Sequence, residues 1–282
     1  MNIQIRNMTR ADLPDADRIF CEAFESPGSR IADLTLYYEI QPEGRLIGFV
    51  DGAPVATVAA IDYGPFAYIG AMAVLKEWQR RGLGRAMMEY VLQWLDHKGC
   101  PVVVLDASPS GRPLYVQLGF ETDEDSVQYR LEASVEVQGA HPAVRPMLSD
   151  DLPAVIAFDT PIFGANRGQV LSRLLRDLAG RALIAENAHG EITGYVFAKQ
   201  QGLGPFASEG VEEAEQLLRA ALGLPFQTAP TVRIPSTNLG GGALLTQYGF
   251  KPQRALPHMR CGGAGPVGDH TRLYGLVSYA IG

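Results

Sequence analysis

The chain has 282 residues, of which 46% are hydrophobic and 20% charged, and its formal net charge is −7. These proportions are those of a folded globular protein. Because the negative charge would repel a nucleic-acid backbone, we expect no nucleic-acid partner. The sequence has no run of ~18 apolar residues and opens MNIQIRNMTR, without the apolar stretch of a signal peptide. We therefore expect no membrane partner and a cytoplasmic location.

Residue types that form disulfides or bind metals give no recognisable pattern. Cys21, Cys100 and Cys261 are far apart and odd in number, which predicts neither a disulfide framework nor a zinc site. We expect them to be small buried hydrophobic side chains. The five histidines lack ligand spacing, so no metal is expected.

In chain order, the first half predicts a strand, two helices, antiparallel strands, a long helix, a strand, a short helix and closing strands. Residues 45–50 and 54–62 flank Asp51-Gly52, which is a hairpin signal. The short apolar run 102–105 suits a strand covered on both faces. This order predicts a mixed α/β fold.

Residues 74–88, VLKEWQRRGLGRAMM, hold the most informative motif. A buried strand leads into a Gln-x-x-Gly-x-Gly turn and then into a helix with apolar residues at three- and four-residue spacing. Backbone N–H groups at a helix start have no partner within the helix, and glycine lets a pyrophosphate approach them. The motif predicts a phosphate cradle, beside which Arg80, Arg81 and Arg85 add charge. The alternative is a basic turn without a ligand.

The chain also contains an internal duplication. IRNMTRADLP aligns with VRPMLSDDLP, YGPFA with LGPFA and LYVQLGF with LLTQYGF, and the three matches keep their order. The repetition predicts two domains, residues 1–134 and 143–282, joined by a linker at 135–142.

The second half repeats the order of elements around a second hairpin signal, His189-Gly190. Gly240 to Gly242 are expected to form a structural turn instead of a second phosphate loop. The other predicted elements are strands at 181–186 and 191–199, helices at 171–178 and 214–222, and a last strand within 273–281.

The first half resembles the GCN5-related N-acetyltransferase (GNAT) superfamily. QRRGLG at 79–84 matches its acyl-CoA motif, Gln/Arg-x-x-Gly-x-Gly/Ala at the start of a long helix, and Tyr115 followed by residues 118–120, Leu-Gly-Phe, matches its later motif. The second half is similar to the C-terminal domain of bacterial tandem proteins of this superfamily, on the segments FDTPIFGANR, GLGPFA and IPSTN. The resemblance implies two tandem GNAT-like domains, each a central, mostly antiparallel sheet flanked by helices.

The resemblance further implies acetyl-CoA as the cosubstrate and no metal. Tyr115 would donate a proton or a hydrogen bond to the leaving thiolate, and the alternative is an ordinary half-buried aromatic side chain. The strand that ends at Val74 would diverge from the strand at 102–105 and open a wedge for the cofactor. The cofactor-binding residues implied are Met72, Ala73 and Val74 along the pantetheine arm and Gln79, Arg80, Arg81, Gly82, Leu83, Gly84 and Arg85 at the pyrophosphate.

The second copy departs from the superfamily pattern. After GPFA it runs SEGVEEAEQLL, with acidic residues where arginines would face phosphate, and Leu245 stands in the place of Tyr115. The frequent asparagine of the superfamily is present there as Asn238, whereas the first copy has Ser108. The second copy is therefore not expected to bind CoA in the usual way.

We expect the second copy to shape the acceptor side of the site. Asp159 and Arg167 are candidate substrate contacts, and the alternatives are a helix cap or a structural ion pair. The base that accepts the proton of the amine is not singled out by the sequence. Four carboxylates could lie near the mouth but are more typical of solvated surface groups: Glu22, Glu25, Glu39 and Asp62.

Together these features predict an acetyl-CoA-dependent N-acetyltransferase. The acetyl group would move to the amine of a small molecule or amino-acid-like acceptor, which is the expected partner, by direct attack on the thioester. The alternatives are a non-catalytic CoA-binding sensor or assembly module, and a protein lysine or N-terminal acetyltransferase. The acceptor, the acyl-chain preference and the oligomeric state, a homodimer included, stay open.

Overall fold

The computed structural model describes residues 2–132 and 142–282, which form two compact units. Unit 1 contains the described residues of Met1–Glu121 with Met259–Ala264 and Ile281, and unit 2 contains the rest. Each unit thus includes a segment from the other half of the sequence. The domain ranges 1–134 and 143–282 stay a prediction about the duplication, and the expected linker at 135–142 lies outside the described residues except for Pro142.

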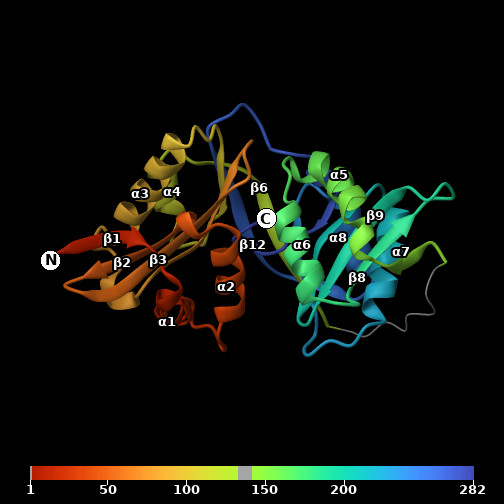
Figure 1. The fold of residues 1–282 in the computed structure, drawn as a ribbon, viewed down its shortest axis with the longest axis horizontal. Coiled ribbons are helices and arrows are strands. Elements are labelled where there is room, and N and C mark those ends of the chain that lie inside the picture. The colour runs from red at the N-terminus through yellow and green to blue at the C-terminus, as the bar shows by residue number, and fades with distance from the viewer. Residues whose placement is uncertain (1, 133–141) are drawn as a thin grey trace. The chain divides into compact units, whose positions relative to one another are not determined.

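Unit 1 is a mixed α/β unit. Its strands follow the order β1-β2-β3-β4-β5, and the end of β12 lies next to β5. Helices α1 and α2 cover one face of the sheet, and α3 and α4 cover the other (Figure 1). The elements are β1 (Ile3–Asn7), α1 (Leu13–Phe24), α2 (Ile31–Ile40), β2 (Arg45–Val50), β3 (Ala53–Asp62), β4 (Ala67–Val74), α3 (Leu83–His97), β5 (Val103–Asp106), α4 (Arg112–Gln117) and the last residues of β12 (Phe250–Cys261).

The hairpin predicted around Asp51-Gly52 is confirmed as β2 and β3. Asp51 has a φ of 49° and Gly52 a φ of 86°, and two left-handed central residues are what a tight hairpin turn requires. Along β2 the side chains alternate between the two helical layers. A Cβ built on Gly48 would lie 2.8 Å from Met87 Sδ of α3, whereas Arg45 Nε donates to the carbonyl oxygen of Tyr37 of α2.

The helix predicted from Leu83 is confirmed as α3, and its buried face forms part of the core of unit 1. The prediction is wrong for one position, because Tyr90 was expected on the buried face but is 40% exposed. The buried side chains of α3 are Leu83, Met87, Met88, Val91 and Leu95.

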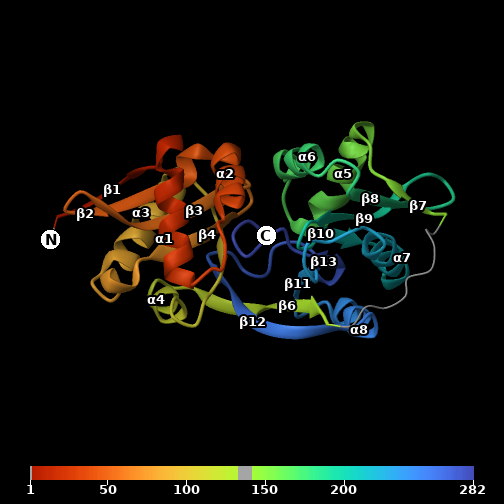
Figure 2. The same ribbon diagram turned by 90° about the horizontal axis from the view of Figure 1, so that it is seen from below.

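Unit 2 repeats this architecture. Its strands follow the order β12-β6-β11-β10-β9-β8-β7, and β13 pairs with β10. Helices α5 and α6 lie on one face of the strands and α7 and α8 on the other (Figure 2). The elements are β6 (Glu121–Leu131), β7 (Val144–Pro146), α5 (Leu152–Phe163), α6 (Gly168–Asp177), β8 (Ala182–Glu186), β9 (Ile192–Lys199), β10 (Gly202–Ser208), α7 (Val211–Leu222), β11 (Thr231–Pro235), α8 (Leu239–Gln247), β12 and β13 (Leu273–Gly275).

The duplication is visible in matching ion pairs as well as in the order of elements. Arg6 pairs with Asp12 through two hydrogen bonds of 2.7 and 2.8 Å, and Arg145 pairs with Asp151 with the same two distances. In each copy the arginine lies on the first strand and the aspartate just before the first long helix. The aligned sequences therefore fold into equivalent local structures.

The cysteines differ from expectation. All three are free but only half-buried, because they lie at the margins of the packed interior; Cys100 and Cys261, for example, pack against the core of unit 1. Among the described residues, no helix is long and apolar enough to cross a membrane. Within the same residues, no three His, Cys, Asp or Glu side chains are grouped so that they could hold a metal ion.

Candidate active site

Strand β4 contains a β-bulge at the position where the resemblance implies backbone contacts to a cofactor. Ala59 of β3 lies opposite Gly70, and Thr57 lies opposite Ala73. Ala71 and Met72 therefore share a single partner position on β3. Ala71 has a φ of 48°, in the left-handed region that residues with a Cβ seldom adopt. A bulge removes one residue from the hydrogen-bonded ladder and aims its backbone elsewhere.

Beyond the bulge, β4 also parts from β5. The two strands are parallel and paired at three positions, of which the last is Ile69 opposite Leu105. β4 then continues to Val74 without a partner on that side among the described strands. We call residues 70–74 the open edge of β4. The divergence expected from the sequence is therefore present.

The side chains of the open edge mostly belong to the core. Ala73 is 3% and Val74 8% exposed, whereas Met72 is half-buried. Any contact that Ala73 and Val74 make to a ligand would therefore come from their backbone groups, as the resemblance implies.

The glycine-rich turn lies between the open edge and α3. Gly82 is the N-cap of α3 with a φ of 86°, and a Cβ there would meet no atom within 4 Å. The position is thus open in space but restricted to glycine by its backbone. Gly84, in the first turn, is closely covered, since a Cβ there would lie 3.5 Å from Leu114 and 3.6 Å from Met72. The first N–H groups of α3 have no partner within the helix.

Gln79 ties this turn to the strand. Its Nε2 donates to the carbonyl oxygen of Val74 at 2.9 Å. The first residue of the motif therefore fixes the loop against the end of β4, and the role that the sequence suggested, a contact to the cofactor, stays a prediction.

The three arginines of the turn are available to different degrees. Arg80 and Arg81 are exposed, and within the described part of the chain neither forms an ion pair; the Arg81 guanidinium lies 4.9 Å from the ring centre of Trp78. Arg85 is half-buried, lies 3.5 Å from Glu89 and donates to Gln117. The helix start is therefore positively charged, which favours a phosphate ligand.

Tyr115 of α4 is 6% exposed and packs against Phe120, with 6.0 Å between ring centres. A Cβ on Gly111 would lie 3.1 Å from its hydroxyl oxygen, so the phenol lies against the start of α4. Burial raises the pKa of Tyr115 to about 12. The phenol is therefore protonated at neutral pH and able to donate.

Asp159 and Arg167 are brought together in unit 2, but away from solvent. Arg167 Nε donates to Asp159 at 2.9 Å and Nη2 at 3.0 Å, and the side chains are 0% and 1% exposed. Tyr195 donates to Asp159 at 2.5 Å, and its pKa is raised, chiefly by burial. The Arg167 guanidinium also lies 3.9 Å above the ring of Phe163. Of the readings that the sequence left open, this geometry favours the structural ion pair.

The four carboxylates considered as bases have local partners. Glu22 lies 3.6 Å from Arg18, and Glu25 and Glu39 are paired with Lys76 and Arg10. The ion pair with Lys76 lowers the pKa of Glu25. Asp62 accepts from the N–H of Gly64 at 2.9 Å. None of these contacts favours a neutral-pH base, so the structure does not select one of the four.

The equivalent of the open edge in unit 2 is filled. β10 and β11 are parallel and paired only at Gly202 and Leu203. Beyond this point β13 pairs with β10, with Gly275 opposite Phe206, and Leu276 donates its N–H to Arg233 of β11 at 2.8 Å. The last strand predicted from the sequence is thus confirmed, but sequence reasoning missed that it lies between β10 and β11. Its apolar composition gave no signal for that position.

Asn238 holds this inserted strand. Its side-chain oxygen accepts from the N–H of Gly241 at 2.7 Å, which caps α8, and its amide donates to the carbonyl oxygen of Leu273 at 3.1 Å. Ser108 caps the start of α4 in the same way, through Gly111 at 3.1 Å. The expected turn at Gly240–Gly242 is the first turn of α8.

The start of α7 lacks the features of the α3 turn. Gly210 is its N-cap, and Glu212 and Glu213 occupy the first turn. These carboxylates suit the positive end of the helix dipole but would repel phosphate. Leu245, aligned with Tyr115, is 3% exposed in the core of unit 2.

A bulged strand, a diverging parallel neighbour and a glycine-rich helix start define the GNAT class of acetyltransferase domain. The sequence agrees: the profile of the Acetyltransferase (GNAT) family matches residues 13–120, and that of a second Acetyltransferase (GNAT) domain matches residues 155–275. The chain therefore belongs to the GNAT superfamily and contains two of its domains in tandem.

Two curated proteins are similar over most of their length. The uncharacterized N-acetyltransferase YitH of Bacillus subtilis is 27% identical over 248 residues, which cover 85% of this chain and 86% of YitH. The holothin acyltransferase of a Pseudoalteromonas strain is 25% identical over 258 residues, which cover 89% of this chain and 86% of that protein. These similarities support an acyltransferase.

Solved structures agree on the tandem fold. A candidate acetyltransferase of Pyrococcus horikoshii has a TM-score of 0.88 and 28% identity, covering 99% of this chain and 96% of that one. A GCN5-related N-acetyltransferase of Sphaerobacter thermophilus has a TM-score of 0.71 and 15% identity, covering 94% and 98%; at this identity it supports the fold alone.

Proposed function

We propose that the protein is an acetyl-CoA-dependent N-acetyltransferase and that unit 1 is its catalytic part. The observation that carries this proposal is the coincidence, in unit 1, of the open edge of β4 and the positively charged start of α3. The same two places in unit 2 are filled by β13 and lined by glutamates. Acetyl-CoA, when bound, supplies the activated acetyl group as a thioester.

The bulge gives the open edge its role. Backbone groups of Met72 and its neighbours are released from the ladder by the bulge at Ala71, so they are free to bind a ligand that lies along the edge. An N–H aimed at the developing oxyanion of an acyl-transfer reaction contributes roughly 2.7–4 kcal/mol. The loop at Gln79–Arg85 would hold the pyrophosphate through the N–H groups of α3 and through Arg80 and Arg81.

Tyr115 is the residue proposed to act on the leaving group. Its buried phenol stays protonated through the range in which an amine loses its proton. The amine nitrogen attacks the thioester carbon, the carbon–sulfur bond breaks, and the thiolate receives a proton or a hydrogen bond from the phenol. The proton of the amine leaves to a base or to water, which the described side chains do not identify.

The acceptor is proposed to be an amine on a small or amino-acid-like molecule. The relative named holothin acyltransferase is named for one defined acceptor, which supports acyl transfer to a single compound by a chain with this arrangement. The second domain would then be accessory, since its equivalent of the open edge is closed by its own strand.

The test is acetyl-CoA turnover, followed as free thiol, against small amines, amino acids and peptides. We expect CoA release that depends on one class of acceptor and is lost in Gly82→Glu. Normal acetyl-CoA binding without acceptor-dependent release would instead favour a sensor, and release only with peptides would favour a protein acetyltransferase.

A further inference from the structure

Arg45, at the start of β2, is a buried cation whose outer nitrogens have no partner. The side chain is 3% exposed, and its Nε donates to the carbonyl oxygen of Tyr37 at 2.9 Å. Nη1 and Nη2 are both buried and form no hydrogen bond with the residues that the structure describes. A guanidinium has five N–H donors, so four of them are unused here.

No carboxylate neutralises this group. The charges that act on it come from the tyrosines Tyr37 and Tyr63, and burial lowers the pKa of Arg45 to about 9, which still leaves it charged at neutral pH. Leaving a charge buried and unpaired costs several kcal/mol. A protein seldom keeps such a group unless a ligand or water completes it.

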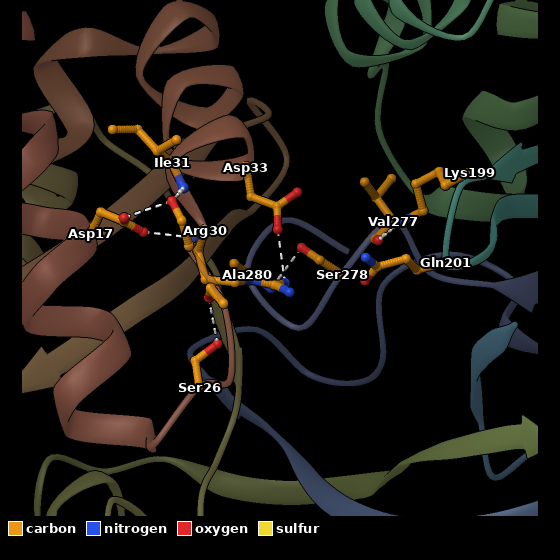
Figure 3. Close-up of polar contacts among 12 residues, drawn as sticks. Asp17, Ser26, Arg30, Ile31, Asp33, Lys199, Gln201, Val277, Ser278 and Ala280 are labelled. Atoms are coloured by element: carbon orange, nitrogen blue, oxygen red, sulfur yellow. Dashed lines mark hydrogen bonds and ion pairs between the residues drawn. The ribbon is translucent and has the colours of Figure 1, made fainter. Parts of the chain in front are cut away.

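The acidic residues of the covering helix are already paired with other cations. On α2, Asp33 lies 2.8 Å from Arg30 and Glu39 is paired with Arg10. Asp17 of α1 is also engaged, since it accepts from the backbone N–H of Arg30 at 2.6 Å, as Figure 3 shows. The loop between α1 and α2 is therefore fixed by its own contacts, which leave Arg45 unpaired.

The carboxylates at the ends of the adjacent strands have a different partner. Lys98 lies 3.7 Å from Glu43 and 4.0 Å from Asp62. Arg45 thus stands alone among several ion pairs of unit 1.

The fold itself does not require an arginine at this position. Arg6 lies opposite Ile47 in the first copy, and Arg145 lies opposite Ile184 in the second. Counting two residues back along the paired strand, Arg45 corresponds to Ala182, which is 1% exposed. The equivalent strand of unit 2 therefore packs with a small apolar side chain where unit 1 places an unpaired cation.

We propose that Arg45 is the anchor for a carboxylate group of the acceptor, so that the substrate is an amine that also carries a carboxylate. Arg45 projects to the face covered by α1 and α2, opposite to the face covered by α3. The proposal rests on the acetyltransferase function proposed above, and it makes Arg45 a specificity-determining residue that binds the substrate away from the reacting nitrogen.

The chemistry favours a carboxylate over a phosphate. Nη1 and Nη2 form a planar fork that matches the two oxygens of a carboxylate. A single negative charge balances the single charge of Arg45, whereas a phosphate dianion would need a second cation, and no other cation acts on this group. Because the fork is buried, the ligand has to displace what covers it, Tyr37 of α2 included, and the pairing then forms in a region of low dielectric.

Binding can be tested without catalysis by titrating the full chain with sodium formate, against sodium chloride at equal ionic strength, and following the unfolding temperature. We expect formate to stabilise the wild type and the control Arg18→Met, which removes an arginine of α1 with a side chain 42% exposed. Arg45→Met should bind formate about 10- to 100-fold more weakly. Equal stabilisation of Arg45→Met and wild type, or none of the wild type, would overturn the proposal.

The acetylation assay then separates this proposal from the general function. Each amino acid is compared with its amide and with the amine that lacks the carboxyl group. We expect KM for the acid to be about 10- to 100-fold below that for the other two, and Arg45→Met to remove the difference. Equal use of the three by the wild type would refute the carboxylate anchor but not acetyl transfer, whereas acetylation of no amine, with formate binding intact, would refute only acetyl transfer.

If Arg45→Met does not fold, Arg45→Lys keeps the charge and removes the fork. It should retain formate binding at about 10-fold lower affinity. Undiminished formate binding by Arg45→Lys would contradict a forked carboxylate contact.

Discussion

The two units place different things at the same position of one fold. In unit 1, β4 parts from β5 after Ile69 and leaves an open edge. In unit 2, β10 parts from β11 after Leu203, and β13 lies there with hydrogen bonds to both strands. A sheet that has been opened for a ligand has unpaired backbone groups, and these can be satisfied by a cofactor or by another strand.

This difference explains the pattern of side chains around each position. Where a ligand is to bind, the helix start has Gly82 and free arginines; where the chain fills its own gap, the helix start has Glu212 and Glu213. Asn238, which caps a helix in the same way as Ser108, gains a second task in unit 2 by holding β13. Loss of cofactor chemistry and gain of a strand thus go together.

If unit 2 is a purely structural body, its buried charges matter for stability alone. Asp159→Asn should lower the free energy of unfolding by about 3–5 kcal/mol, because it leaves Arg167 charged and unpaired in the core. Urea unfolding measures the change. Asp159→Leu combined with Arg167→Leu should recover part of it, and a small effect of Asp159→Asn with a large loss of turnover would point to a catalytic role.

The cofactor side of the comparison is tested by Gly82→Glu. Its carboxylate would face the phosphates, and acetyl-CoA affinity should fall more than about 100-fold by calorimetry. Gly190→Glu is the matched control, because Gly190 also has a positive φ, 78°, and open space around its Cβ position, but lies in the hairpin of unit 2. Equal losses in the two variants would show that strain, not the site, is responsible.

Tyr115→Phe removes the phenol that unit 2 lacks. We expect kcat to fall about 10- to 100-fold with unchanged acetyl-CoA affinity. Since the pKa of Tyr115 is raised to about 12, the phenol stays protonated from pH 7 to 10, and the pH profile of the variant should keep the wild-type shape over this range. A basic limb that disappears in Tyr115→Phe would contradict this assignment. Leu245→Tyr, at the aligned position, should change neither quantity.

Asn238→Ala tests what holds β13 in place. Loss of the cap costs about 1 kcal/mol, and the Leu273 carbonyl loses a donor in addition. Hydrogen exchange at residues 273–276 should accelerate. Ser108→Ala, which removes only a cap, should leave these amides unchanged; if both variants accelerate exchange equally, Asn238 has no special part in retaining the strand.

The smallest effect concerns the duplicated ion pairs. Arg6 and Arg145 hold the pKa values of Asp12 and Asp151 below the ordinary range. Such carboxylates stabilise the folded state above their unfolded pKa, near 4, and lose this contribution as the pH falls. Asp12→Asn and Asp151→Asn should each cost about 1 kcal/mol at pH 7, since the arginines are partly exposed. The cost should shrink below pH 4; a cost independent of pH would exclude the ion pairs as its source.

Local patterns predicted what depends on neighbours in sequence. The spacing of apolar residues gave α3, Asp51-Gly52 gave its hairpin, and the run 102–105 gave β5 within a residue at each end. The position of β13 between β10 and β11, and the isolation of Arg45, depend on contacts between segments that are distant in sequence. A pattern of residue types does not encode which distant strand will be the partner, so the open and the filled positions could not be told apart from it.

The composition of unit 1 has a consequence for synthesis. Met259, fully buried in the core of unit 1, and Cys261, packed against that core, come from the end of β12. A chain emerging from the ribosome cannot complete this core when its first half has been made, but only after nearly all of unit 2 has followed. The catalytic part should therefore mature late, and chains stopped before Phe250 should expose an unfinished sheet to chaperones and proteases.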